Sequence, residues 1–265
     1  MPSLVSFCRR LKGRYRRTVA ARLARRPARL RNIGPLISFT FDDFPSSALA
    51  IGGALLREHG AQGTYFTSFG LMGTVCPTGE IFRTDEIPPL LEAGHELGCH
   101  TFHHYHPYDT PAPIFDQSLE RNREALRAYA PRGEFATFSY PLDCPSAAVK
   151  RRCARRFRGC RGGGQIFNQG VVDLNYLSAV FIEQEREQPD RMKRLIDNCV
   201  KTNGWLIFAT HDVCAAPTRF GCTPAEFGDI VRYASRSGAR IMTMRDALRM
   251  AFPPAGAVPP PTTAS

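Results

Sequence analysis

Residues 36–43 read LISFTFDD, a short strand-forming run followed at once by two aspartates. Aromatic, aliphatic and β-branched side chains make the first six residues typical of a buried strand. Further runs of this kind recur along the chain, so we expect seven strands in all. The other six lie at 63–68, 95–99, 135–140, 178–182, 205–210 and 240–243.

Helical patterns separate many of these runs. The predicted helices cover 46–59, 84–93, 114–130, 189–202, 223–237 and 244–251. Because strands that alternate with helices are joined by crossover connections, the strands should be mainly parallel. The pattern predicts an α/β fold over residues 34–252, a distorted (β/α) barrel of about seven mainly parallel strands.

The net charge of +11 is concentrated at one end of the chain. Residues 1–33 hold eleven of the 35 Lys and Arg residues and none of the 24 Asp and Glu residues, so the remainder is neutral. We expect a basic, helical arm at 1–33. The last residues, 253–265, are rich in proline and cannot form a core, so a disordered tail is expected there.

An apolar stripe runs along the predicted arm and leaves three readings open. The arm could be a solvated extension that packs this stripe on the domain, a helix on an anionic membrane surface through residues 1–31, or a nucleic-acid-binding arm. Nucleic acid is the least favoured of the three. The stripe consists of Leu4, Phe7, Leu11, Tyr15, Val19 and Leu23.

Compartment can be judged from cysteines and targeting signals. The nine cysteines show no CxxC spacing, and no apolar stretch of secretory-signal length follows the basic residues. These features favour a reducing compartment, and we expect a cytoplasmic protein, located at the inner face of the membrane if the arm has its membrane-binding role.

Acidic and imidazole side chains follow several predicted strands. Asp42 and Asp43 follow the first strand, His100 and His104 follow or lie just beyond the third, and His211 follows the sixth. In barrels the carboxyl ends of the strands build the active site. One carboxylate and two histidines, here Asp43, His100 and His104, suit Zn²⁺ or a similar divalent ion with open positions. The spacing of four would place both imidazoles on one side of a helical turn.

Such an ion can polarise a carbonyl and lower the pKa of bound water, so that water can attack an amide. Hydrolysis also needs a base and an acid. Asp42 is the candidate base, although a bend after Phe41 is required for both aspartates to reach one site. His211 is the candidate acid because histidine titrates near neutral pH.

Four segments resemble a known family. FTFDDF, HTFHH, FSYP and LIFATHD are similar to the first, second, third and fifth motifs of the polysaccharide deacetylases, carbohydrate esterases that include chitooligosaccharide and peptidoglycan deacetylases. The resemblance implies a hydrolase of linear amides that removes N-acetyl or O-acetyl groups from sugars with a metal. By position, Asp42 resembles the base, Asp43, His100 and His104 the metal ligands, and His211 the acid.

The resemblance also implies an oxyanion donor, the backbone N–H of Tyr140. The family's third motif often holds an arginine beside the catalytic aspartate, which is absent here. Arg161, after the next strand end, could supply that charge. The fourth motif is weak, with Asp173 as the nearest match and a candidate to orient His211. Ala209 stands where leucine is common and would reshape the acyl pocket.

A basic run, residues 150–161, is expected to be a solvated helix face, or else a rim that attracts an anionic glycan or phosphate group. The main hypothesis is deacetylation of an amino-sugar oligosaccharide or polysaccharide. A second keeps fold and metal but hydrolyses a non-carbohydrate linear or cyclic amide. A third is a non-catalytic protein that binds glycan or nucleic acid.

Overall fold

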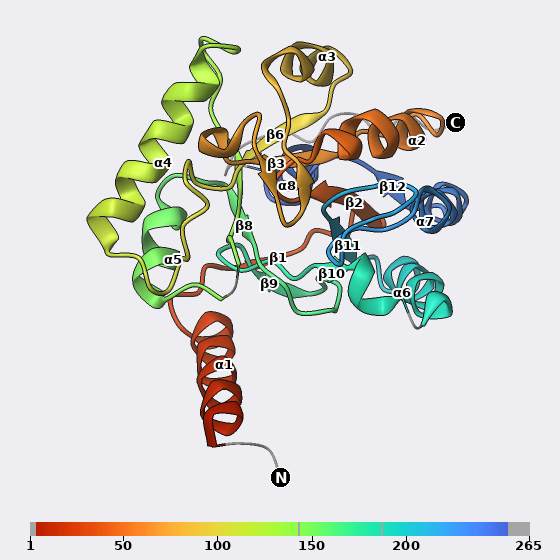
Figure 1. The fold of residues 1–265 in the computed structure, drawn as a ribbon. Coiled ribbons are helices and arrows are strands. Elements are labelled where there is room, and N and C mark those ends of the chain that lie inside the picture. Colours follow the sequence, from red (N-terminus) through yellow and green to blue (C-terminus); the bar gives the residue numbers. More distant parts are fainter. Residues whose placement is uncertain (1–3, 143, 187, 254–265) are drawn as a thin grey trace.

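The computed structural model describes residues 4–142, 144–186 and 188–253. At its centre, seven parallel strands in the order β10-β11-β2-β3-β6-β7-β8 curl into a half-barrel, and β12 pairs with the start of β2 (Figure 1). The predicted α/β barrel is therefore confirmed. The strands are β2 (Leu36–Phe41), β3 (Thr64–Thr67), β6 (Glu96–Cys99), β7 (Thr137–Ser139), β8 (Gly159–Arg161), β10 (Val180–Phe181), β11 (Trp205–Thr210) and β12 (Arg240–Ile241).

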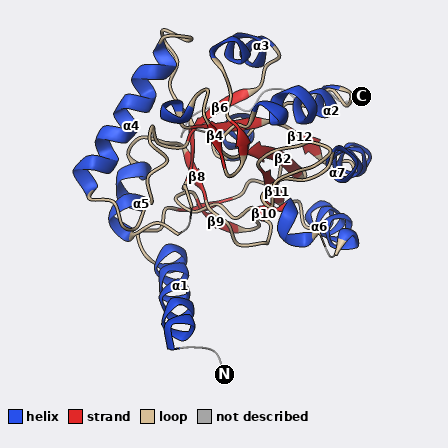
Figure 2. Cartoon of the chain, viewed as in Figure 1, coloured by secondary structure: helices blue, strands red, loops and turns tan. Residues whose placement is uncertain are grey.

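Helices surround this sheet (Figure 2). Thr223 shows how the sequence starts one of them, because its hydroxyl accepts a hydrogen bond from the N–H of Glu226 while Pro224 fills the first helical position. The predicted helix at 46–59 is a π-helical turn, Ala48–Gly53, that continues into α2. The α-helices are α1 (Leu4–Arg22), α2 (Ala54–Arg57), α3 (Ile87–Glu92), α4 (Ala112–Arg127), α5 (Ala147–Ala154), α6 (Pro189–Lys201), α7 (Pro224–Arg236) and α8 (Met244–Ala251).

Alternation along the strands divides the buried side chains into two sets. Leu36 and Trp205 pack inside the barrel with α8, and the indole N–H of Trp205 donates to Ser38 at 3.0 Å. Phe39 and Phe208 belong instead to the larger core beneath the outer helices. Because successive strand residues point to opposite faces, every second position of β2 and β11 faces the barrel interior.

Helix α8 closes the amino-terminal end of the barrel. The N–H of Met244 donates to the hydroxyl of Thr64 at 2.9 Å, and the N–H of Arg245 donates to the carboxylate of Glu96 at 2.8 Å. Thr64 and Glu96 are the first residues of β3 and β6. The interior is therefore covered at this end, which leaves the carboxyl end of the strands for a site.

The basic arm packs on the domain through its second half. Arg16 forms an ion pair with Asp109, and the buried Lys150 donates to the carbonyl of Ala20 at 2.6 Å. Beyond α1, strand β1 (Pro27–Arg29) pairs antiparallel with β9 (Val171–Asp173). The guanidinium of Arg26 also donates to the carbonyls of Ala154, Phe157, Arg158 and Leu174.

The apolar stripe of the arm does not lie on the domain as one face. Val19 is buried, whereas Leu11, Tyr15 and Leu23 are 59%, 62% and 49% exposed. Helix α1 projects away from the barrel (Figure 1). None of the described helices combines the length and apolar composition that crossing a bilayer requires. The predicted tail at 253–265 lies, apart from Pro253, outside the described residues.

The basic run at 150–161 differs from its expectation. It is not one solvated helix face but the end of α5, a turn and strand β8. Lys150 and Arg161 are fully buried or nearly so, at 0% and 1% exposure. Sequence patterns also missed β1, β9 and the short hairpin of β4 (Val75–Cys76) and β5 (Gly79–Glu80).

Candidate active site

The inward positions of the strands deliver polar side chains to the open end of the barrel. Counting by two from Ser38 reaches Asp42, whose N–H still donates to the carbonyl of Thr210 at 2.9 Å. Counting by two from Trp205 reaches His211. Since both residues continue the inward series of their strands, both line the same cavity of about 680 Å³.

Asp43 reaches this cavity through a bend in the backbone. In an extended chain it would point opposite to Asp42, but its φ of +62° and that of Phe44, +52°, are left-handed. The bend required by the sequence is therefore present, one residue after Asp42. It brings Oδ1 of Asp43 to 3.6 Å from Nε2 of His100 and 3.1 Å from Nε2 of His104.

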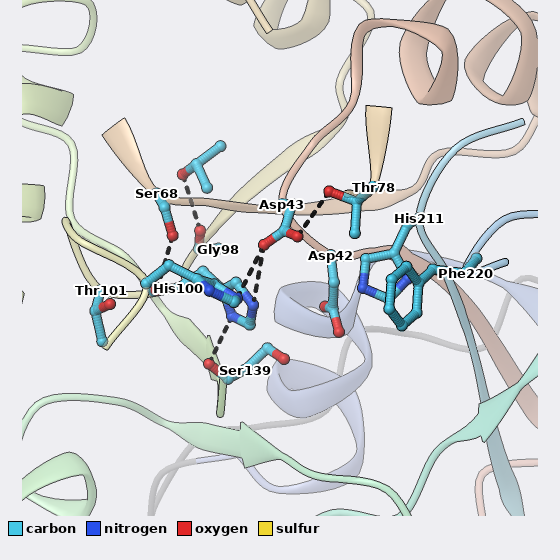
Figure 3. Close-up of polar contacts among 12 residues, drawn as sticks. Asp42, Asp43, Ser68, Thr78, Gly98, His100, Thr101, Ser139, His211 and Phe220 are labelled. Carbon is cyan, nitrogen blue, oxygen red and sulfur yellow. Dashed lines mark hydrogen bonds and ion pairs between the residues drawn. The ribbon is translucent and has the colours of Figure 1, made fainter. Parts of the chain in front are cut away.

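These three residues fit a divalent metal ion. One ligand atom from each lies within 4.8 Å of the others (Figure 3). Oδ1 of Asp43 is buried without a hydrogen-bond donor, while Oδ2 accepts from the hydroxyl of Thr78 at 2.9 Å. A buried carboxylate oxygen that lacks a donor is costly unless a cation compensates it, so the orphan atom supports a metal here.

The state of His100 also suits a metal ligand. Its Nδ1 lies 2.8 Å from the carbonyl of Ser139, which can only accept, so Nδ1 carries the proton and Nε2 is free for a ligand bond. Burial lowers the pKa of His100 to about 4 despite the nearby aspartates. The imidazole is therefore neutral near pH 7, as coordination requires.

The loop that carries His104 is not the helical turn that the spacing suggested. Residues 100–106 form bends without a helix, and both Thr101 and His104 have left-handed φ values, +61° and +56°. The two imidazoles still meet, with ring centroids 5.0 Å apart. His103 points elsewhere, and its Nδ1 lies 3.2 Å from the hydroxyl of Ser118.

Arg161 reaches the candidate base from β8, across the barrel interior. Its guanidinium forms an ion pair with Asp42 and donates to the hydroxyl of Ser139 at 2.7 Å. Burial alone would raise the pKa of Asp42, but Arg161, His100 and His211 together hold that pKa well below its usual range. Asp42 is therefore an anion at every physiological pH.

His211 lies on the other side of Asp42 from the metal-type residues (Figure 3). Its Nδ1 is 3.1 Å from the carbonyl of Phe220, which fixes the proton on that nitrogen and leaves Nε2 available to the cavity. Phe181 stacks near the imidazole with ring centroids 6.4 Å apart. Among the residues that the structure describes, no carboxylate forms an ion pair with His211, so the carbonyl of Phe220 orients the ring.

Two expected roles are therefore corrected. The N–H of Tyr140 donates to the carbonyl of Arg161 at 3.1 Å within the β7–β8 ladder, so it is not free to hold an oxyanion. Asp173 does not orient His211. Its carboxylate instead accepts from Lys150 at 2.8 Å and from backbone N–H groups, including that of Arg26, which anchors the arm.

Glu183 is a cavity residue that the sequence patterns did not single out. Its Oε2 is buried without a hydrogen-bond partner, and burial, reinforced by Asp42, raises its pKa to about 8. It is therefore mostly protonated near pH 7 and can donate a hydrogen bond. Its position could have identified it, because Glu183 directly follows the predicted strand at 178–182, just as the other polar site residues follow their strands.

Comparisons with known proteins agree with this geometry. The family model for polysaccharide deacetylase matches residues 31–155, a range that includes Asp42, Asp43, His100 and His104. A comparison with curated protein sequences found no match.

Several solved structures share the fold. PdaA of Bacillus subtilis, a family 4 carbohydrate esterase, is 14% identical, with 88% of this chain and 86% of that chain covered and a TM-score of 0.54. The Xyl-CE4 domain of a multidomain xylanase from the hindgut metagenome of Trinervitermes trinervoides is 14% identical, with 82% and 90% covered and a TM-score of 0.56.

A family 4 pseudoenzyme from Bacillus anthracis is also similar, at 10% identity, 82% and 66% coverage and a TM-score of 0.54. At such low identities, the structural likeness establishes the fold alone. The family model relates residues 31–155, which include Asp43, His100 and His104, to the polysaccharide deacetylases. Residues 31–155 of the chain, with Asp42 as well as these three residues, therefore match the polysaccharide deacetylase family.

Proposed function

We propose that the chain is a metal-dependent hydrolase that removes N-acetyl or O-acetyl groups from amino-sugar oligosaccharides or polysaccharides, with Zn²⁺ as the metal. One observation carries the proposal above the others. Asp42, held as an anion by Arg161, lies between the Asp43–His100–His104 set and His211 at the open end of the barrel. Metal-assisted acyl transfer to water uses a base, an acid and a Lewis acid, and these residues offer the base, the acid and the ligands for the metal.

Each residue has a defined task in this reaction. When bound, the ion polarises the acyl carbonyl and activates water. Asp42 accepts the proton of the attacking water, and Arg161 keeps its carboxylate ionised and oriented. His211, protonated on both ring nitrogens, donates the proton of Nε2 to the departing amine or alcohol, while its Nδ1–H stays bound to the carbonyl of Phe220. The rings of Phe181 and Phe220 line the cavity near His211 and make this part of its wall apolar.

Two alternatives share this fold. A non-carbohydrate linear or cyclic amide would use the same residues, and a non-catalytic binding protein would not need them. The pseudoenzyme among the structural neighbours shows that the fold alone does not guarantee activity. The proposal is supported against the binding protein by the presence of all five of Asp42, Asp43, His100, His104 and His211 in one cavity.

The experiment combines metal analysis with acetate release from N-acetylglucosamine oligomers and from a panel of small linear and cyclic amides. We expect one equivalent of zinc and acetate from the oligomers. Asp42→Asn should lose acetate release with zinc retained, and Asp85→Asn, an exposed acid, should behave like wild type. Activity on the amide panel alone would show that the substrate is a non-carbohydrate amide and not an acetylated sugar. A zinc-free, inactive protein after reconstitution would favour the binding hypothesis.

Membrane contact by the basic arm is a second proposal. It is supported by the outward placement of Leu11 and Tyr15 on a helix that also carries exposed arginines. Salt-dependent sedimentation with phosphatidylglycerol vesicles, lost on deletion of residues 1–31, is the expected result. Binding that survives the deletion would reject it. A cytoplasmic location stays a prediction.

A further inference from the structure

The rim of the catalytic cavity carries two arginines that the proposed chemistry does not use. Arg17 lines the cavity from α1, and Arg219 lines it from the loop that follows β11. Neither segment belongs to the motifs that resemble the deacetylases, apart from the nearby His211. Any role for these side chains therefore concerns a part of the substrate other than the acyl group.

Arg17 has a fixed place because its neighbours anchor the helix. Arg16 stacks over Tyr108 at 4.4 Å and pairs with Asp109, while Lys150 binds the carbonyl of Ala20. These contacts lie on the side of α1 that faces the domain. Arg17, one residue further along the helix, is exposed and turned toward the cavity that contains His103 and Leu142.

Neither guanidinium has a counter-ion in the described part of the chain. Among the described residues, no carboxylate lies within 4.0 Å of Arg17 or Arg219. By contrast, other arginines take part in 13 of the 17 ion pairs of the described residues. Arg219 lies only over the ring of Phe220, 4.5 Å from its centroid. An arginine that lacks a partner and faces a ligand cavity is suited to a carboxylate or phosphate.

The acids of the cavity do not neutralise this charge. Asp42 is paired with Arg161, and Asp43 belongs to the metal-type set. Glu183 lies deeper, near Asp42, and is mostly protonated near pH 7. The outer cavity is therefore cationic, and it becomes more so when a divalent ion is bound. A neutral sugar chain would gain no electrostatic attraction from these arginines, whereas an anionic one would.

We propose that Arg17 and Arg219 bind an anionic group of the substrate, so that the acetylated sugar acted on by this chain carries a phosphate or carboxylate. This inference rests on the proposed function and names its substrate class. Helix α1 is then a wall of the substrate site as well as an arm. The cavity volume of about 680 Å³ leaves room for a charged substituent beyond one sugar ring.

The same helix distinguishes two sources of that anion. Leu11 and Tyr15 are 59% and 62% exposed on α1, so much of their apolar surface is open to solvent. A lipid-linked sugar phosphate would place its chain beside these residues, whereas a soluble sugar phosphate would not use them. The anionic group is common to both sources, and only the lipid arm of the experiment should respond to changes at Leu11 and Tyr15.

The test measures binding, so that it does not depend on turnover. Calorimetry with the full zinc-loaded chain at low salt compares N-acetylglucosamine 1-phosphate with N-acetylglucosamine. We expect the phosphate to tighten binding by about tenfold or more. Arg17→Gln and Arg219→Gln should each reduce this preference several-fold without changing the affinity for the neutral sugar. Arg14→Gln, an exposed change one turn earlier on α1, is the matched control.

The lipid arm uses the same sugar phosphate linked to a long-chain alcohol in phosphatidylcholine vesicles. Binding that is weakened by Leu11→Glu and Tyr15→Glu identifies a lipid-linked source, and binding unaffected by them identifies a soluble one. A phosphate preference that survives both Arg17→Gln and Arg219→Gln would assign the phosphate to the metal and overturn the inference. Equal affinity for the two sugars would also overturn it. Absence of acetate release with the preference intact would count against the proposed function alone.

Discussion

Arg161 and Asp42 form a buried ion pair across 119 positions of sequence, and each is less than 8% exposed at its side chain. Their contact crosses the barrel interior from β8 to the end of β2. Without the guanidinium, only His100 and His211 would oppose the effect of burial, so the pKa of Asp42 would rise. The arginine is therefore the main group that keeps the base ionised.

Replacement of Arg161 should alter the pH dependence of catalysis. In Arg161→Gln we expect kcat/KM for acetate release to fall by about 10- to 100-fold near pH 7. The acidic limb of the profile should also move to higher pH, because Asp42 then protonates at a higher pH than in wild type. Arg161→Lys should restore part of the activity and shift the limb back. An unchanged acidic limb in Arg161→Gln would show that Asp42 is not the titrating base.

Replacement of a histidine of the candidate metal site should abolish the increase in the free energy of unfolding that zinc causes. For wild type, zinc at 100 times its Kd should add about 2.7 kcal/mol to the free energy of unfolding, since the ion binds only the folded chain. His104→Ala should lose both bound zinc and this stabilisation, whereas His103→Ala, whose imidazole contacts Ser118, should keep them. Thermal melts with and without zinc, together with metal analysis, measure the difference. Zinc-dependent stabilisation of His104→Ala equal to that of wild type would contradict the assignment.

The buried Lys150–Asp173 pair should contribute to stability rather than catalysis. Lys150→Met leaves the carboxylate of Asp173 without its cation and frees the carbonyl of Ala20, so we expect a loss of about 3–5 kcal/mol. Arg151→Met, an exposed change on the same helix, should stay within about 0.5 kcal/mol. Urea unfolding followed by circular dichroism measures both. A Lys150→Met chain as stable as wild type would show that this pair does not hold the arm.

Glu183 should make stability depend on pH. Its pKa of about 8 lies above the ordinary value of 4.5, so the folded state holds a proton that the unfolded state has released. Its contribution is complete below pH 4.5 and is lost as the pH rises through 8. Glu183→Gln cannot ionise, and its melting temperature relative to wild type should increase between pH 5 and pH 9. A constant difference across this range would mean that Glu183 is already ionised in the folded chain.

Much of the barrel could be predicted because its strands are short, apolar and regularly spaced by helices. The inward register could be predicted as well, since Ser38, Asp42 and His211 follow from counting by two along β2 and β11. The hydrogen bond from the N–H of Tyr140 to the carbonyl of Arg161 depends on how β7 pairs with β8, and the motif resemblance alone gave no sign of it.

Other features depend on contacts that no local pattern encodes. The left-handed backbone at Asp43 and His104 is imposed by the surrounding loops, and neither residue type requires it. The partner of Asp173 is Lys150, which lies in a run that looks solvated in sequence and becomes buried only when α1 and β9 pack over it. Arg161 can take the place of the arginine missing from the third motif because β7 and β8 pair so that Arg161 lies beside Ser139 of that motif.

The contribution of α1 to the cavity wall has a practical consequence for anyone who trims this protein. A fragment that starts near residue 34 would retain the barrel and every candidate for acyl chemistry, and it could still cleave a small neutral reporter. It would lack Arg17 and the tether formed by Arg26, so its preference among natural substrates would be misjudged. The boundary of the stable core and the boundary of substrate choice do not coincide in this chain.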